Sequence, residues 1–132
     1  MGKFYSALGL MSGTSLDGVD VSIINSDGKS EYSTILDKYF EYDDHLNQKL
    51  FKLRDKISIP EDLVKYKAEV DSIEREITLF NAKAVNETLK FIKSSIDVIG
   101  FHGQTIFHDP TKKVTKQLGD GKLLSQLTKK KV

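Results

Sequence analysis

The stretch GLMSGTSLDGVD, residues 9–20, interrupts an apolar run with small, hydroxyl and acidic residues. Both flanks are strand-like: FYSALGLM at 4–11, and VDVSIIN at 19–25, where apolar and polar residues alternate. A turn signal at 25–28 and a further strand-like segment at 31–40 follow. The beginning of the chain therefore predicts an antiparallel meander of three strands, whose first connecting loop is unusually rich in glycine and hydroxyl residues.

After this meander the apolar period lengthens from two residues to between three and four, which predicts helices. Asp43 or Asp44 can cap the first helix. A second apolar stripe predicts one or two long amphipathic helices between residues 61 and 93. Residues 96–101 return to strand character, and a short strand, a turn at residues 119–121 and a short helix complete the pattern. This order predicts an α/β fold in which helices cover a mixed sheet.

The composition is that of an ordinary globular domain. The chain has 132 residues, with 20 basic and 19 acidic side chains and a formal net charge of +1. This near balance of charge argues against nucleic acid or an anionic membrane surface as a partner. No apolar segment approaches the roughly 20 residues that a membrane-spanning helix needs. Cysteine is absent, which excludes disulfides and thiolate metal sites and suits a cytosolic protein.

The loop inside residues 12–18 has the composition of an anion-binding turn. Backbone N–H groups of such a turn can converge on an anion, and Thr14 and Ser15 add hydroxyl donors. We expect Gly13 and Gly18 to allow positive φ and the close approach of a ligand. Asp17 can hold Mg²⁺ directly or through water. The same residue types also form ordinary hairpin turns, so composition alone leaves both interpretations open.

A second polar segment, HGQT at residues 102–105, follows the strand at 96–101. Ligands of open α/β sheets bind at the carboxyl ends of strands, where these side chains are expected. His102 can donate to or accept from a sugar hydroxyl, and Gln104 can do both at once. The alternative is a strand-end histidine that is bonded only to the backbone.

The two segments together resemble the anhydro-N-acetylmuramic acid kinase family. GLMSGTSLDGVDV is similar to the family's N-terminal signature, and IGFHGQTIFH followed by QLGDG resembles a second block in matching order. The resemblance implies one lobe of an actin-like ATPase (ribonuclease H-like) fold, a mixed sheet that opens with a β-hairpin meander and is covered by long helices. It also implies a bacterial cytoplasmic enzyme of peptidoglycan recycling. Such enzymes use ATP and water to convert 1,6-anhydro-N-acetylmuramic acid to N-acetylmuramic acid 6-phosphate.

The resemblance further implies the roles of individual residues. The residues expected to contact the ATP phosphates are Gly13, Thr14, Ser15, Asp17, Gly18 and Asp20, with Mg²⁺ near Asp17 or Asp20. The residues expected to contact the sugar are His102, Gln104 and Thr105.

Members of the family are far longer than this chain, so residues 1–132 are expected to form part of an N-terminal domain, with the second domain absent. The general base and the adenosine pocket are expected beyond Val132, and the isolated chain is expected to be inactive. The alternatives are a non-catalytic phosphate- or sugar-binding remnant, or half of a split enzyme that a C-terminal polypeptide completes. Self-association into a homo-oligomer is compatible with each of them. A last alternative is a helical interaction module built on residues 61–93, which burial of their apolar stripe would exclude.

Overall fold

The N-terminal meander forms three strands of a four-stranded sheet. The structure is a computed structural model that describes residues 2–132. The strand order is β3-β2-β1-β4, with β1 and β3 antiparallel to β2 and with β4 parallel to β1, so the predicted mixed sheet is confirmed. The four strands are β1 (Tyr5–Met11), β2 (Gly18–Ser26), β3 (Tyr32–Glu41) and β4 (Val98–Phe101).

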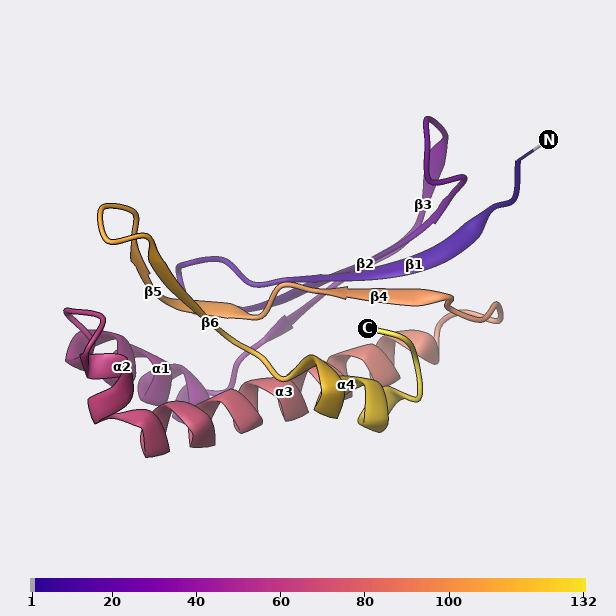
Figure 1. Ribbon diagram of the computed structural model, residues 1–132. Coiled ribbons are helices and arrows are strands. Elements are labelled where there is room, and N and C mark those ends of the chain that lie inside the picture. The colour runs from indigo at the N-terminus through magenta and orange to yellow at the C-terminus, as the bar shows by residue number, and fades with distance from the viewer. Residues whose placement is uncertain (1) are drawn as a thin grey trace.

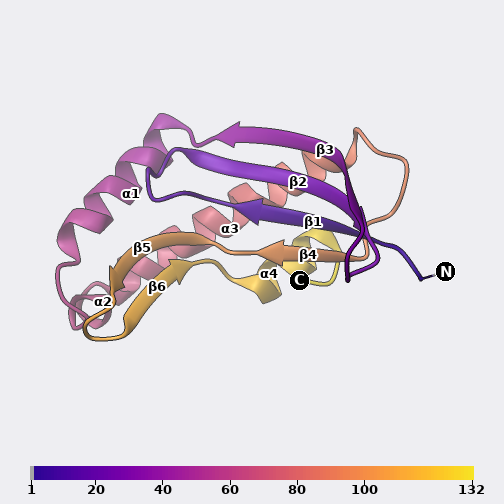
Figure 2. The same ribbon diagram turned by 90° about the horizontal axis from the view of Figure 1, so that it is seen from above.

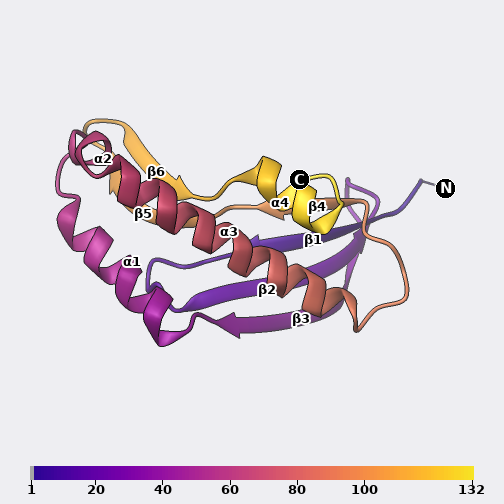
Figure 3. The ribbon, with the colours of Figure 1, turned by 90° about the horizontal axis from the view of Figure 1, so that it is seen from below.

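Four helices lie on one face of this sheet (Figure 1). They are α1 (Asp44–Lys56), α2 (Asp62–Lys65), α3 (Lys67–Leu89) and α4 (Gly121–Thr128). Seen from below, α3 runs under the strands with α4 beside it (Figure 3), whereas the view from above shows the strands uncovered (Figure 2). None of the helices within residues 2–132 is long and apolar enough to cross a membrane.

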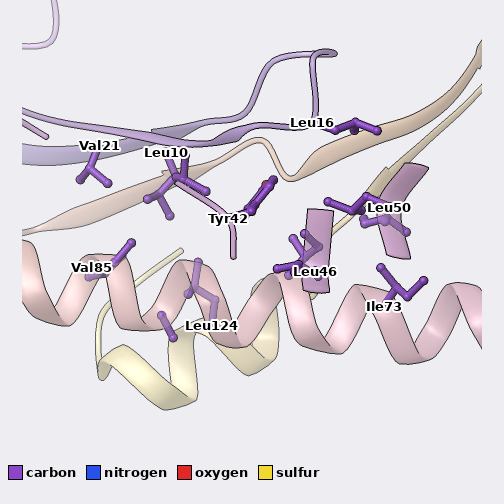
Figure 4. Packing of buried hydrophobic residues seen from close by; sticks show 14 of the residues in the cluster. Leu10, Leu16, Val21, Tyr42, Leu46, Leu50, Ile73, Val85 and Leu124 are labelled. Carbon is purple, nitrogen blue, oxygen red and sulfur yellow. The ribbon is translucent and has the colours of Figure 1, made fainter. Parts of the chain in front are cut away.

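The core fills the space between the sheet and the helices, as Figure 4 shows. Alternate residues of β2, Val19, Val21 and Ile23, are buried, as the two-residue period predicts. The apolar stripe of α3 is buried as well, including Ile73 and Ile77. Each such side chain stabilises the fold by about 1.5–3 kcal/mol. Because the stripe is covered, the structure removes the basis for the helical interaction module.

The helix boundaries differ from the expectation at one end. The carboxylate of Asp43 accepts a hydrogen bond of 2.8 Å from the Leu46 N–H and caps α1, as predicted. α3 ends at Leu89, however, and does not reach residue 93. The Phe91 N–H donates to the Thr88 carbonyl over 3.0 Å, so the chain tightens into a turn at that point.

The segment after β4 contains a strand that the sequence did not indicate. β5 (Gln104–Asp109) pairs antiparallel with β6 (Val114–Leu118) in a separate two-stranded sheet. Of the polar segment at 102–105, only His102 and Gly103 connect β4 to β5, because Gln104 and Thr105 already belong to β5. Gly103 has a φ of +78°, and an added Cβ would lie 2.6 Å from the Leu118 carbonyl oxygen. Only glycine suits this close approach.

Candidate functional site

Residues 12–17, the β1–β2 loop, present polar groups to solvent around one buried anchor. Thr14, Ser15 and Asp17 are exposed, whereas Leu16 is completely buried in the core (Figure 4). Leu16 has a φ of +61°, and its N–H lies 3.4 Å from the Gly13 carbonyl oxygen. The expectation of positive φ at the loop glycines is therefore wrong. The left-handed residue is a leucine, whose burial offsets the backbone strain.

The two glycines of the loop region serve different purposes. At Gly18 an added Cβ would overlap the Phe40 carbonyl oxygen and would lie 2.7 Å from the Tyr39 hydroxyl. The space beside Gly18 is thus filled by β3 and not by a ligand, which corrects that part of the prediction. At Gly13 the nearest atom to an added Cβ would be the Ser15 Oγ at 3.8 Å, so this position is open.

Three carbonyl groups of the loop region are held by the rest of the molecule. The Gly13 carbonyl accepts a bond of 2.9 Å from Gln104 Nε2, and the Leu16 carbonyl accepts one of 2.7 Å from Asn47 Nδ2. The Asp17 carbonyl accepts a bond of 2.8 Å from the Tyr42 N–H. These bonds fix the loop from β5, α1 and the β3–α1 junction.

Unlike these carbonyls, the backbone N–H groups at the tip of the loop have no partner in the protein among the described residues. Among residues 2–132, no acceptor is found for the backbone N–H of Thr14 or of Ser15. Both side chains are exposed and add hydroxyl donors at the same place. A turn whose backbone donors have no protein acceptor, flanked by exposed hydroxyls, is suited to an anion.

A buried polar network lies beneath the loop. The Tyr42 hydroxyl lies 3.0 Å from Gln104 Oε1 and 3.1 Å from Ser12 Oγ. Since an amide oxygen only accepts, Tyr42 donates to Gln104 and accepts from Ser12. Gln104 donates its two amide hydrogens to the carbonyls of Gly13, at 2.9 Å, and Thr105, at 3.2 Å. Burial raises the pKa of Tyr42 to about 12, so its hydroxyl remains a donor at neutral pH.

The network changes the interpretation of Gln104. This side chain is completely buried, with both amide hydrogens donated to backbone carbonyls. The sequence led us to expect Gln104 in an open sugar site. In this structure its side chain instead positions the β1–β2 loop. Tyr42 was not identified from the sequence, because an aromatic residue after a strand is most simply explained as part of the core.

Two predicted cation-binding residues lie on the same side of the molecule. Asp17 and Asp20 are both exposed. Desolvation, and then the charges of Asp17, Glu41 and Asp20, raise the pKa of the nearby Tyr39. Within residues 2–132 no group of three or more His, Cys, Asp or Glu side chains is arranged to hold a metal ion. Any Mg²⁺ here would need further oxygen ligands from phosphate or water.

The exposed His102 borders a separate pocket of about 430 Å³. Its Nδ1 lies 3.1 Å from the Gly103 carbonyl oxygen, which only accepts, so Nδ1 is the donor of this contact and Nε2 is left for a ligand. Thr105 is half-buried on β5, opposite Gln117. The pocket is lined by Ile99, Gly100, Phe101, His102, Gly103, Gln117, Gly119, Gly121 and Val132.

The wall of this pocket is fastened to α3. The Gly119 N–H donates to Glu74 Oε2 over 3.1 Å, and the Asp120 N–H donates to Thr78 Oγ1 over 3.0 Å. Asp120 in turn caps α4 by accepting from the Leu123 N–H over 3.0 Å. The predicted turn at 119–121 is therefore a direct connection from β6 to α4, because Gly121 already begins the helix.

Comparison with known proteins gives one consistent result. The family model described as anhydro-N-acetylmuramic acid kinase matches residues 5–132. An anhydro-N-acetylmuramic acid kinase of Pelagibacter ubique is 55% identical over 132 residues, which cover 100% of this chain and 35% of the relative. The corresponding protein of Agrobacterium fabrum is 41% identical, with 97% of this chain and 35% of the relative covered. That of Rhizobium etli is 36% identical, with 93% and 34% covered. The chain thus spans about a third of the length of these relatives.

Proposed function

Because this chain belongs to the anhydro-N-acetylmuramic acid kinase family, we propose that it forms part of the N-terminal domain of a sugar kinase. In this proposal the β1–β2 loop receives the phosphates of ATP, and the pocket at His102 receives the sugar. The overall reaction would consume ATP, 1,6-anhydro-N-acetylmuramic acid and water, and would yield ADP and N-acetylmuramic acid 6-phosphate.

The geometry of the loop tip carries the phosphate assignment. Thr14 and Ser15 offer backbone N–H groups with no protein acceptor within residues 2–132, together with exposed hydroxyls. Gly13 leaves open space beside them. Phosphoryl transfer depends mainly on positioning and on neutralising charge, and a loop fixed by its carbonyls with unpaired donors at its tip would supply the positioning.

The acidic side chains suit ATP only together with a divalent cation. Asp17 and Asp20 would repel free triphosphate, but Mg²⁺ is bound through one or two carboxylates combined with phosphate oxygens and water. Asp17 belongs to the loop itself and Asp20 to the following strand, so both carboxylates can face an ion on the phosphates. Mg²⁺ would neutralise the charge that develops on the transferred group.

The pocket at His102 suits a sugar by size and by chemistry. Its volume of about 430 Å³ lies within the range of small-molecule sites. His102 Nε2 can form a hydrogen bond with a sugar hydroxyl, whereas Thr105 pairs with the pocket residue Gln117 but does not itself line the pocket. Four of the lining residues are glycines, at positions 100, 103, 119 and 121.

The other parts of the kinase would lie outside residues 1–132. The meander with a parallel fourth strand supports a lobe of the actin-like ATPase fold. We place the general base, the adenosine pocket and the second domain in the part of the relatives that this chain does not span. A C-terminal polypeptide would supply them, in the cytoplasm. A non-catalytic phosphate- or sugar-binding module is the second candidate, since the β1–β2 loop is complete without those parts.

ADP release tests the proposal. The purified chain is assayed with Mg–ATP and 1,6-anhydro-N-acetylmuramic acid, alone and with the remaining part of the Pelagibacter ubique relative. We expect sugar-dependent ADP release only from the mixture, and its loss in Asp17→Asn but not in Asp55→Asn, an exposed position on α1. Sugar-dependent release by the chain alone would contradict the placement of the general base. Full activity of Asp17→Asn would contradict the phosphate site.

A further inference from the structure

We propose that Tyr42 is a positioning residue that clamps both ends of the β1–β2 loop in the conformation that receives phosphate. Its N–H donates to the carbonyl of Asp17, the last residue of the loop, over 2.8 Å. Its hydroxyl accepts from Ser12, the first residue, over 3.1 Å. The phosphate in this inference rests on the proposed function, whereas the clamp itself rests on these contacts.

The hydroxyl of Tyr42 belongs to a closed chain of hydrogen bonds. Ser12 donates to Tyr42, Tyr42 donates to Gln104 over 3.0 Å, and Gln104 donates to Gly13 over 2.9 Å. The direction is fixed, because a reversed Gln104 amide would place its oxygen against the Gly13 and Thr105 carbonyls. The chain begins and ends on adjacent loop residues, so each bond restricts the next.

Tyr42 itself is held in place by core packing and by its position between β3 and α1. Tyr42 is 3% exposed, and its ring packs edge-to-face on Phe80 of α3 with 4.9 Å between the ring centres. The preceding residue ends β3, and the following residue, Asp43, caps α1. Neither end of the Tyr42 backbone can move without disturbing a strand or a helix. The exposed loop tip is therefore held in place by a buried residue.

Tyr42→Phe separates the clamp from the core, because it removes the hydroxyl and keeps the ring. We expect amide hydrogen exchange at Leu16 to become about tenfold faster. The ¹⁵N order parameters of Thr14 and Ser15 should fall from about 0.85 towards about 0.6. The Kd for Mg–ATP should rise about tenfold. Tyr32→Phe, at an exposed position of β3, is the matched control and should change none of these quantities.

The outcomes distinguish the clamp from the proposed function. Unchanged exchange and order parameters in Tyr42→Phe would overturn the clamp, and so would a mobile loop with an unchanged Kd for Mg–ATP. If the unsubstituted chain binds no Mg–ATP, alone or with the remaining part of the Pelagibacter ubique relative, but the loop loosens in the variant, the clamp stands and the proposed function fails. If Tyr42→Phe does not fold, Ser12→Ala removes the same hydroxyl contact without touching the ring. It must loosen the loop in the same way, or the clamp is refuted.

Discussion

The side-chain amide of Gln104 donates a hydrogen bond of 2.9 Å to the carbonyl of Gly13, a residue 91 positions earlier. This bond joins the β1–β2 loop to the start of β5, the two segments that suggested a function in the sequence. Gln104 is completely buried there, so the bond is shielded from water. The proposed phosphate and sugar segments are therefore joined directly by a buried hydrogen bond.

Gln104→Glu should destabilise the fold. A buried carboxylate would face the carbonyls of Gly13 and Thr105, and the two donors would be lost. We expect the free energy of unfolding to fall by about 3 kcal/mol at pH 7. The native state raises the pKa of such a buried carboxyl, so part of the loss should be recovered on acidification to pH 5, where protonation restores a donor. Urea unfolding at both pH values measures this, with the exposed Gln48→Glu as the control. Equal effects of the two substitutions would contradict the buried network.

Gly18→Ala should also destabilise the fold, for a steric reason. The added Cβ would overlap the Phe40 carbonyl oxygen and crowd the Tyr39 ring. Overpacking against backbone costs about 2 kcal/mol. Gly9→Ala is the control in the neighbouring strand, because its Cβ would meet only the Ser22 carbonyl oxygen at 4.0 Å. Thermal unfolding compares the two variants, and a Gly18→Ala protein as stable as Gly9→Ala would refute the close packing of β2 on β3.

ATP binding should require magnesium. The exposed Asp17 and Asp20 repel triphosphate unless a divalent cation lies between them and the phosphates. We expect calorimetric titration to detect Mg–ATP binding that disappears with EDTA. Asp17→Asn should weaken this binding about tenfold, whereas the exposed Asp55→Asn should not. Equal affinity for ATP with and without magnesium would rule out the proposed role of the carboxylates.

Tyr42 should make the protein sensitive to alkali. Burial raises its pKa from 10.0 to about 12, so between these values the native state holds a proton that the unfolded chain releases. Stability is therefore lost as the pH rises through this window. The free energy of unfolding should fall by about 2 kcal/mol more in the unsubstituted protein than in Tyr42→Phe between pH 10 and pH 12. Guanidinium unfolding across this range measures the difference, and parallel curves would show that the hydroxyl is not buried as described.

Local patterns in the sequence predicted most of the fold. Alternation at 19–25 indicated β2, and helical spacing after Asp43 indicated α1. These features depend on neighbours in the chain, which is why they can be read from it. β5 was missed because its first residues are polar, although Gln104 is buried.

The details of the site could not be predicted in the same way. Gln104 contacts partners 62 and 91 residues away, and no local period encodes such contacts. Leu16 was missed as the left-handed residue because that conformation ordinarily favours glycine. The exposed residues of the β1–β2 loop were identified by composition, but the groups that hold the loop were not. The sequence therefore predicted the exposed polar residues of the loop, but not the buried hydrogen bonds that hold it.

One measurement tests the central claim most directly, namely that the β1–β2 loop is the phosphate site. Backbone amide resonances of the ¹⁵N-labelled chain are followed during titration with Mg–ATP. Saturable shifts should concentrate at residues 13–18 and should weaken in Tyr42→Phe but not in Tyr32→Phe. Subsequent addition of 1,6-anhydro-N-acetylmuramic acid should shift residues 102–105. An absence of shifts at residues 13–18, or saturable shifts confined to another surface, would contradict the phosphate site.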